Sequence, residues 1–286
     1  MRIGTAFASV LLLLLSLSGN CQLTQTLVPQ IVEFSSGKLQ LKAYLWKPTG
    51  SGPFPAVLFN HGSGDAEADR TAGMPITQAA TVLAPFFIKN GYAFFYPFRR
   101  GHGPSASQAP FMRDVLRREE ESRGKEARQR LQFILLTTEQ LDDVMAALAF
   151  LKTVPGIDSR RIAIAGHSFG GQLTLLAAER ERTIRAAVTF AAAADSWERS
   201  PELRERLTSA IHNTSAAIML THAQNDFSTA AGTELAAELK RLHQPYVLKI
   251  YPRVGLRSDD GHNMLYENIP AWESDVFEFL DQHLKN

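Results

Sequence analysis

The chain has 286 residues, of which 45% are hydrophobic and 21% are charged, a balance typical of a folded globular protein. Its formal net charge of +1 excludes the broad basic surface of a nucleic-acid-binding protein, and it leaves small-molecule substrates open.

The N-terminal segment has the layout of a secretory signal. Arg2 supplies a positive charge, a leucine-rich apolar run follows, and small residues precede Cys21. The apolar run is too short to cross a bilayer core of roughly 30 Å. We therefore predict a signal peptide over residues 1–21, a mature domain over residues 22–286, and a secreted or periplasmic location.

Cys21, the single cysteine of the chain, raises the alternative of a lipid anchor. A lipoprotein signal also ends at a cysteine, but Asn20 stands where that signal has a small Gly or Ala. The plain signal is therefore the favoured interpretation. In either case we expect no disulfide in the mature domain.

The first half of the mature chain predicts strands and one helix. Residues 30–48 predict two strands that are joined at a Ser-Gly turn, and residues 53–60 predict a short buried strand. Residues 77–91 predict a helix that ends at Asn-Gly, and residues 92–98 predict the next strand.

The segment 105–136 is rich in charges of both signs and in helix-forming residues. The simpler interpretation is a solvated helical insertion, and the alternative is a small lid over a site. A capping box over Thr137–Gln140 then predicts the start of the next helix. Its apolar face would contain Leu141, Val144, Met145, Leu148 and Leu151.

The second half of the chain alternates strands and helices. Strands are predicted at residues 161–165, 184–193, 216–221 and 246–251, and helices at residues 171–180, 201–212, 233–243 and 270–284. Such alternation predicts an α/β fold with a mostly parallel sheet and helices on both faces. No linker or repeat divides it, so we expect one domain.

Ser168 lies in G-H-S-F-G, between a predicted strand and a predicted helix. The pattern G-x-S-x-G arises easily by chance, but this setting is that of a nucleophile elbow. The strand and the helix nearly touch at such a turn, which explains small residues at Gly166 and Gly170. We therefore predict that Ser168 is a nucleophile.

A serine hydroxyl needs a base, and His262 is the best placed of the eight histidines. It follows the last strand, at the same carboxyl edge of the sheet as Ser168. The remaining histidines have other predicted settings. His61 and His102 lie in glycine-rich stretches, His167 adjoins Ser168 and His222 lies at a strand end. His212, His243 and His283 fall on predicted helices.

The carboxylate that orients His262 is predicted to be Asp226, which follows the penultimate strand at the same edge. Asp195 follows the preceding strand and is the main rival. Asp259 and Asp260 are too close to His262 in the chain to orient it from across the site.

Acyl transfer also needs donors for the oxyanion. The backbone N–H of Phe169, directly after the nucleophile, is one candidate, and the N–H of Ser63 in N-H-G-S-G-D is the other. For the second stretch, an ordinary turn at a strand end is the alternative.

Together these blocks resemble the α/β-hydrolase superfamily, in particular its dienelactone hydrolase-like and prolyl oligopeptidase-like branches. The likeness runs from about Gln30 to the C-terminus and rests on P-F-P-A-V-L-F-N-H-G-S-G, F-R-R-G-H-G-P-S, R-R-I-A-I-A-G-H-S-F-G-G, Q-N-D-F-S and D-G-H-N-M. It implies a serine hydrolase of the α/β-hydrolase fold, with a sheet of about eight strands, no metal and no organic cofactor. Dienelactone hydrolases proper carry a cysteine nucleophile where this chain has Ser168, so their substrate is not carried over.

We therefore predict an exported serine hydrolase that cleaves a small-molecule carboxylic ester through an acyl-enzyme. The alternatives are a small serine peptidase or amidase, and a non-catalytic binding module on the same fold. The shape of the pocket would depend on segment 105–136, on Trp197 and on the loop around Phe227.

Overall fold

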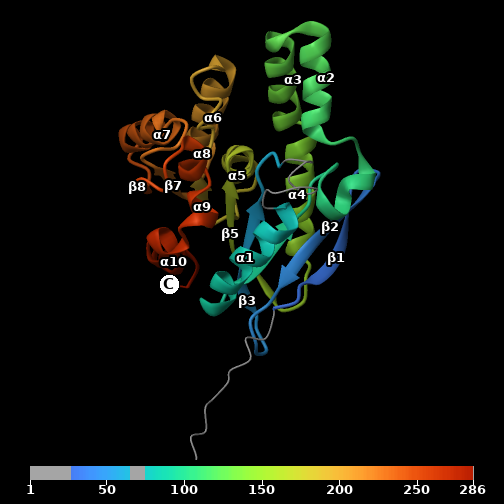
Figure 1. The fold of residues 1–286 in the computed structure, drawn as a ribbon. Helices are drawn as coiled ribbons and strands as arrows, with labels where there is room; N and C mark the ends of the chain where they lie inside the picture. The colour runs from blue at the N-terminus through green and yellow to red at the C-terminus, as the bar shows by residue number, and fades with distance from the viewer. Residues whose placement is uncertain (1–26, 65–74, 286) are drawn as a thin grey trace, which may run out of the picture.

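A computed structural model of the chain describes residues 27–64 and 75–285. In it, eight strands form one sheet that is flanked by helices on both faces (Figure 1). The predicted signal peptide over residues 1–21 and Cys21 lie outside the described residues, and the domain boundaries 22–286 stay a prediction. Among the described residues, no helix is long and apolar enough to cross a membrane.

The strands follow the order β1-β2-β4-β3-β5-β6-β7-β8. The first two pairings, β1 with β2 and β2 with β4, are antiparallel, and all later pairings are parallel. This confirms the predicted mostly parallel sheet. The strands are β1 (Gln30–Ser36), β2 (Leu39–Trp46), β3 (Phe54–Asn60), β4 (Ala93–Pro97), β5 (Ile157–His167), β6 (Ala186–Phe190), β7 (Ala217–Ala223) and β8 (Tyr246–Tyr251).

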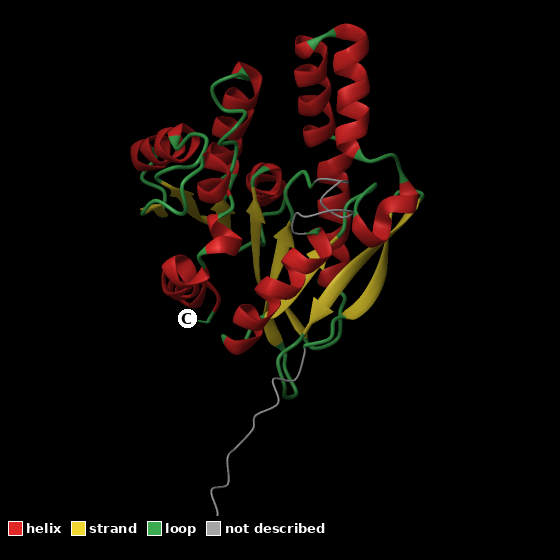
Figure 2. Ribbon diagram, viewed as in Figure 1, coloured by secondary structure: helices red, strands yellow, loops and turns green. Residues whose placement is uncertain are grey.

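The helices cover the two faces of the sheet in separate groups, which Figure 2 shows in red around the yellow strands. Helices α4 (Glu139–Leu151), α5 (Phe169–Arg180), α6 (Pro201–Asn213) and α7 (Ala230–Arg241) share one apolar core with the sheet. Helices α1 (Ile76–Lys89), α9 (Met264–Glu267) and α10 (Ile269–Leu284) share the other.

The central strands supply apolar side chains to both cores, because successive residues of a strand point to opposite faces. In β3, Leu58 belongs to the α4–α7 core, while Val57 and Phe59 belong to the α1–α10 core. All three are fully buried. A continuous apolar run is therefore what a strand between two helical layers requires.

Parallel pairing brings the ends of several strands to one edge of the sheet. Asn60, the last residue of β3, pairs with Gly166 of β5, and His167 of β5 pairs with Phe190 of β6. The segments that follow these strands therefore emerge side by side. This edge is where ligands bind in open α/β sheets.

The segment 105–136 does not form a single helix. It contains the end of a 3₁₀ helix (Gly103–Gln108), then α2 (Met112–Arg123) and α3 (Lys125–Thr137). The last two lie side by side as a hairpin that rises from the carboxyl edge of the sheet (Figure 1). Gly124 joins them with a φ of 86°, a conformation that side chains disfavour.

The predicted capping box over Thr137–Gln140 is wrong. Thr137 is the last residue of α3, and its hydroxyl donates back to the carbonyl of Phe133 at 2.9 Å. Thr138 does the same toward Ile134 at 2.6 Å. Both hydroxyls are thus used by the preceding helix, and α4 begins at Glu139 without a side-chain cap.

Several predicted boundaries also differ from the structure. The strand expected at 184–193 ends at Phe190, because Ala191 and Ala193 adopt positive φ values of 54° and 57°. Strand β5 begins at Ile157 rather than at residue 161, and α7 begins at Ala230 rather than at residue 233. The short helix α8 (Ser258–His262) forms between β8 and the last helix, where the sequence predicts no helix.

Asp143 joins distant parts of the α4–α7 side of the fold. Its carboxylate accepts hydrogen bonds from the Ser36 hydroxyl at 2.6 Å and from the backbone N–H of Arg100 at 2.9 Å. The Arg100 guanidinium adds two more, at 2.9 Å and 2.7 Å. The Asp143 side chain is 1% exposed, so its charge is buried but fully paired.

We expect Asp143→Ala to destabilise the protein by about 3 kcal/mol, because Arg100 would lose its buried partner. Asp142 is the matched control: it is the next residue on α4, but its side chain is 63% exposed and pairs with Arg180 at the surface. Asp142→Ala should cost less than about 1 kcal/mol. Urea unfolding of the two variants measures the difference, and equal losses would contradict this account.

Candidate active site

Ser168 stands on a sharp turn between β5 and α5. Its φ of 54° and ψ of −118° lie outside the regions that residues with side chains normally occupy. The turn is tightly packed, because a Cβ added at Gly166 would lie 2.3 Å from the carbonyl oxygen of Gly170. A Cβ at Gly170 would lie 2.1 Å from the carbonyl oxygen of Asn60. Both glycines are therefore required by close backbone approach.

The structure brings Ser168, His262 and Asp226 together in a hydrogen-bonded chain. His262 Nε2 lies 2.9 Å from Ser168 Oγ, and His262 Nδ1 lies 2.7 Å from Asp226 Oδ1. An ionised carboxylate can only accept, so the neutral His262 carries its proton on Nδ1. Nε2 is then free to accept the proton of the Ser168 hydroxyl. This is the geometry that general-base activation of a serine needs.

Asp226 is buried and receives hydrogen bonds from two imidazoles. His222 Nδ1 donates to Oδ2 at 2.8 Å, on the opposite side from His262, and the backbone N–H of Phe227 donates to Oδ1 at 2.8 Å. Burial by itself raises the pKa of the Asp226 carboxyl, but the hydrogen bonds from His222 and His262 outweigh it and hold the pKa at about 2. Asp226 is therefore an anion throughout the neutral range.

The rival carboxylates have other partners. Asp195 lines the same pocket but forms an ion pair with Arg199 on the exposed surface. Asp260 accepts from the backbone N–H groups of Leu256 and Arg257, and it therefore stabilises the start of α8. Neither replaces Asp226 beside His262.

His167 and His222 form hydrogen bonds to His262 and Asp226, respectively. The imidazole of His167 is buried, and its Nε2 lies 2.8 Å from the carbonyl oxygen of His262. Burial lowers the pKa of His167 to about 3, so it is neutral in the native protein. The sequence places His222 at a strand end and predicts no definite role for it. The local feature that could have indicated its contact with Asp226 is the spacing of four residues between them.

Phe169 and Ser63, whose amides are the predicted oxyanion donors, both line the pocket over Ser168. Phe169 is the first residue of α5, so its N–H is one of the helix-terminal amides that have no partner within the helix. Ser63 follows β3 and lines the pocket together with Ser168, Phe169 and His262. The N-terminal end of α5 adds a favourable field for negative charge.

The pocket over Ser168 has a volume of about 370 Å³. One side is made by the α2–α3 hairpin, through Met112, Arg113 and Leu116 of α2 and Arg128 and Gln132 of α3. Phe227 lines the opposite side, and its ring centre lies 4.6 Å from that of His262. Segment 105–136 thus shapes the pocket wall, and its movement as a lid stays a prediction.

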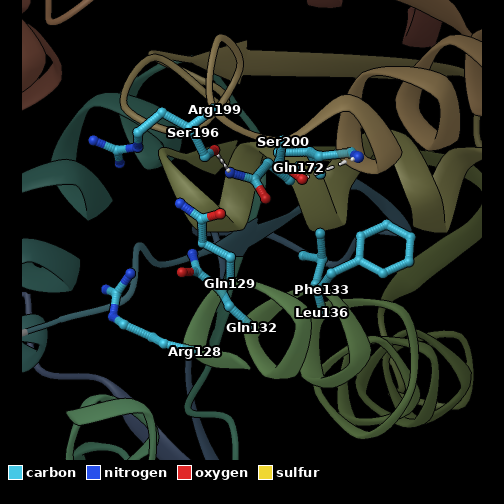
Figure 3. A pocket seen from close by; sticks show the side chains of 10 residues that line it. Arg128, Gln129, Gln132, Phe133, Leu136, Gln172, Ser196, Arg199 and Ser200 are labelled. Carbon is cyan, nitrogen blue, oxygen red and sulfur yellow. Dashed lines mark hydrogen bonds between the residues drawn. The ribbon is translucent and has the colours of Figure 1, made fainter. Parts of the chain in front are cut away.

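A narrow slot continues from this pocket between α3 and the segment that joins β6 to α6. Figure 3 shows Gln129, Gln132 and Phe133 of α3 facing Gln172 and Ser196 across it. The Gln172 side chain donates to Ser196 Oγ at 3.2 Å. Trp197 lines neither cavity, because its ring is buried and its Nε1–H donates to Glu234 at 3.0 Å.

Comparison with known proteins gives a family match over the segment that contains the site. The model of the dienelactone hydrolase family matches residues 105–266, more than half of the chain. The quorum-quenching protein AidA of Acinetobacter baumannii is 26% identical over 172 residues, which are 60% of this chain and 46% of AidA. The chain therefore spans less than half the length of this curated relative.

Solved structures show the same fold. Acylaminoacyl peptidase of Pyrococcus horikoshii has a TM-score of 0.64 and 18% identity, covering 92% of this chain and 42% of the peptidase. Est1E of Butyrivibrio proteoclasticus, solved with ferulic acid bound, has a TM-score of 0.60 and 16% identity, covering 89% of this chain and all of Est1E. These likenesses establish the α/β-hydrolase fold.

The low pKa of Asp226 predicts a specific dependence of stability on pH. A carboxyl whose pKa falls from 3.8 to about 2 on folding stabilises the native state above pH 4, and this stabilisation is lost as the pH falls toward 2. Wild type should therefore lose about 2 kcal/mol relative to Asp226→Asn between pH 5 and pH 2. Thermal unfolding of both proteins across this range measures it, and parallel curves would contradict it.

Proposed function

Because the chain belongs to the dienelactone hydrolase family, we propose that it is a serine hydrolase that cleaves carboxylic esters, with Ser168 as nucleophile. The observation that carries the proposal is the chain of contacts from Ser168 through His262 to Asp226, at 2.9 Å and 2.7 Å. Ser168 takes the place of the cysteine of dienelactone hydrolases proper, and a serine needs such a base to be nucleophilic.

The reaction follows from these contacts. Ser168 Oγ attacks the ester carbonyl carbon while His262 Nε2 accepts the hydroxyl proton. Asp226 stabilises the imidazolium that forms, because it remains ionised. The amides of Phe169 and Ser63 donate to the oxyanion, and His262 returns the proton to the leaving alcohol. Water then attacks the acyl-enzyme by the same route and releases the acid.

The pocket supports a small ester as substrate. A volume of about 370 Å³ lies within the range of small-molecule sites, and the wall combines apolar Met112 and Leu116 with polar Gln132 and Gln172. Such a wall suits an ester whose acyl or alcohol part carries some polar groups. An amide substrate is the second candidate, because the same nucleophile and base cleave both bond types.

We expect Ser168→Ala to reduce turnover of short p-nitrophenyl esters by at least about 10⁴-fold, because among the described residues no other nucleophile is hydrogen-bonded to His262 Nε2. Ser209→Ala, an exposed serine on α6, is the control and should retain full activity. Steady-state kinetics on esters and on the matching anilides measures both variants.

Undiminished ester turnover by Ser168→Ala would refute the nucleophile. Faster cleavage of the anilides than of the esters by wild type would favour the amidase. Failure of a fluorophosphonate probe to label Ser168 in wild type would instead favour a non-catalytic binding module.

We also propose that residues 1–21 direct export, on the basis of the basic start, the apolar run and the small residues before Cys21. Mass spectrometry of the protein from its native host should then find an N-terminus near residue 22. An intact Met1 in the exported fraction, or protein confined to the cytoplasm, would contradict export. A lipid mass on Cys21 would support the anchored alternative.

A further inference from the structure

Arg99 is a fully buried arginine whose side-chain hydrogen bonds go to the segment behind the proposed oxyanion hole and to α4. Its side chain is 1% exposed, and among the described residues no carboxylate lies within ion-pair distance of it. Burying a guanidinium without a contacting anion is costly. Its environment must therefore supply acceptors that offset this cost.

Two of these acceptors are consecutive carbonyls of the loop after β3. Arg99 Nη1 donates to the carbonyl oxygen of His61 at 2.9 Å, and Nη2 donates to that of Gly62 at 2.8 Å. Arg99 Nε donates to Gln140 Oε1 of α4 at 3.0 Å, which anchors the planar guanidinium from its other side. The fork geometry of arginine suits such a pair of acceptors, whereas lysine cannot reproduce it.

His61 contributes a further hydrogen bond to the same carbonyl. The backbone N–H of Arg99 donates to His61 Nε2 at 3.3 Å, and together with the short contact of Nδ1 to the Gly62 carbonyl this places the ring proton on Nδ1. The 3.1 Å approach of Arg99 Nη2 to Nδ1 is then not a hydrogen bond. Nδ1 lies 2.7 Å from the carbonyl oxygen of Gly62 and donates to it. Burial, followed by the charge of Arg99, lowers the pKa of His61 well below its usual value, which keeps the ring neutral for this role.

The direction of the Gly62 carbonyl determines the direction of the Ser63 amide. In a trans peptide the C=O of one residue and the N–H of the next point in opposite directions. Because the Gly62 carbonyl points at Arg99, the Ser63 N–H points away from it. Ser63 lines the pocket over Ser168, so this amide is the one that Arg99 orients.

Arg99 also contacts the second half of the proposed oxyanion hole. Its guanidinium carbon lies 5.7 Å from the centre of the Phe169 ring, within the range of a cation–π contact. One side chain therefore contacts the carbonyl of the Gly62–Ser63 peptide and the ring of Phe169, whose amide is the other proposed donor. The positive charge behind them also favours a developing negative charge.

We propose that Arg99 is a positioning residue of the oxyanion hole, which holds the Gly62–Ser63 peptide in the orientation that donates to the transition state. The inference rests on the proposed function, because it assigns a task to the Ser63 amide. It predicts that losing the guanidinium weakens binding of the tetrahedral transition state more than binding of the ester itself.

The test compares Arg99→Met and Arg99→Lys with the matched control Arg100→Met. Arg100 is the next residue, but it pairs with Asp143 and no hydrogen bond joins its side chain to the loop carbonyls. We expect kcat on p-nitrophenyl esters to fall about 100-fold in Arg99→Met and about 10-fold in Arg99→Lys, with KM changed less than about twofold. Arg100→Met should lose stability but keep kcat.

Two further readouts separate positioning from a general structural role. The Ki of an alkyl boronic acid, which forms a tetrahedral adduct with Ser168, should rise by the same factor as kcat falls. The acidic limb of the pH profile of kcat/KM should not move, because the Ser168–His262–Asp226 chain is untouched. Ser63→Pro, which removes the amide donor, should match Arg99→Met.

Several outcomes would overturn the proposal. These are a kcat within threefold of wild type in folded Arg99→Met, an unchanged boronate Ki, a shifted acidic limb, or an equal loss in Arg100→Met. If Arg99→Met does not fold, Arg99→Lys decides by the same criteria. If the wild type neither cleaves esters nor binds the boronate, the proposed function is refuted, and the role of Arg99 as a positioning residue is refuted with it. Active wild type beside active Arg99 variants refutes the inference alone.

Discussion

The close approach of three backbone segments around Ser168 is the constraint on which the rest of the structure depends. The end of β3, the end of β5 and the start of α5 meet so tightly that neither Gly166 nor Gly170 has room for a Cβ. This contact forces the strained turn at Ser168 and places the loop after β3 beside it. Ser168, the proposed nucleophile, and Ser63, which carries one proposed amide donor, thus come together at one edge of the sheet.

Buried charges organise the surroundings of this turn, and each has its partners. Asp226 is held between two imidazoles and a backbone N–H, while Asp143 receives four hydrogen bonds from Ser36 and Arg100. Arg99 has carbonyl and amide oxygens in place of an anion. A buried charge that is satisfied in this way has little freedom to move, so it determines the orientation of the groups around it.

The α2–α3 hairpin is an insertion between β4 and β5 in an otherwise regular alternation of strands and helices. It enters after β4, rises above the carboxyl edge and supplies one wall of the pocket. Its outer faces carry ion pairs such as Arg117 with Glu121, which are exposed and contribute little to stability. The inner side chains Met112 and Leu116 are buried against the body of the protein. The hairpin therefore shapes one wall of the pocket but takes no part in the contacts among Ser168, His262 and Asp226.

The sequence alone was enough for the order of strands and helices, because hydrophobic periodicity is a local property. Position after a strand is also local, and it led to the prediction of Ser168, Asp226 and His262 as catalytic residues, which stays a prediction. The end of β6 at Phe190 and the start of α4 at Glu139 were not predictable in this way. They depend on positive φ values at Ala191 and Ala193 and on hydroxyls that bond backwards, and tertiary context selects both.

Only the tertiary structure decided which polar residues share the site. His222 lies four residues from Asp226, but Arg99 is 37 residues from Gly62 and 70 from Phe169 along the chain. No local pattern relates such distant residues, since parallel crossovers alone bring them to one edge of the sheet. The sequence therefore indicated the groups that are proposed to react, whereas folding determined which residues hold them.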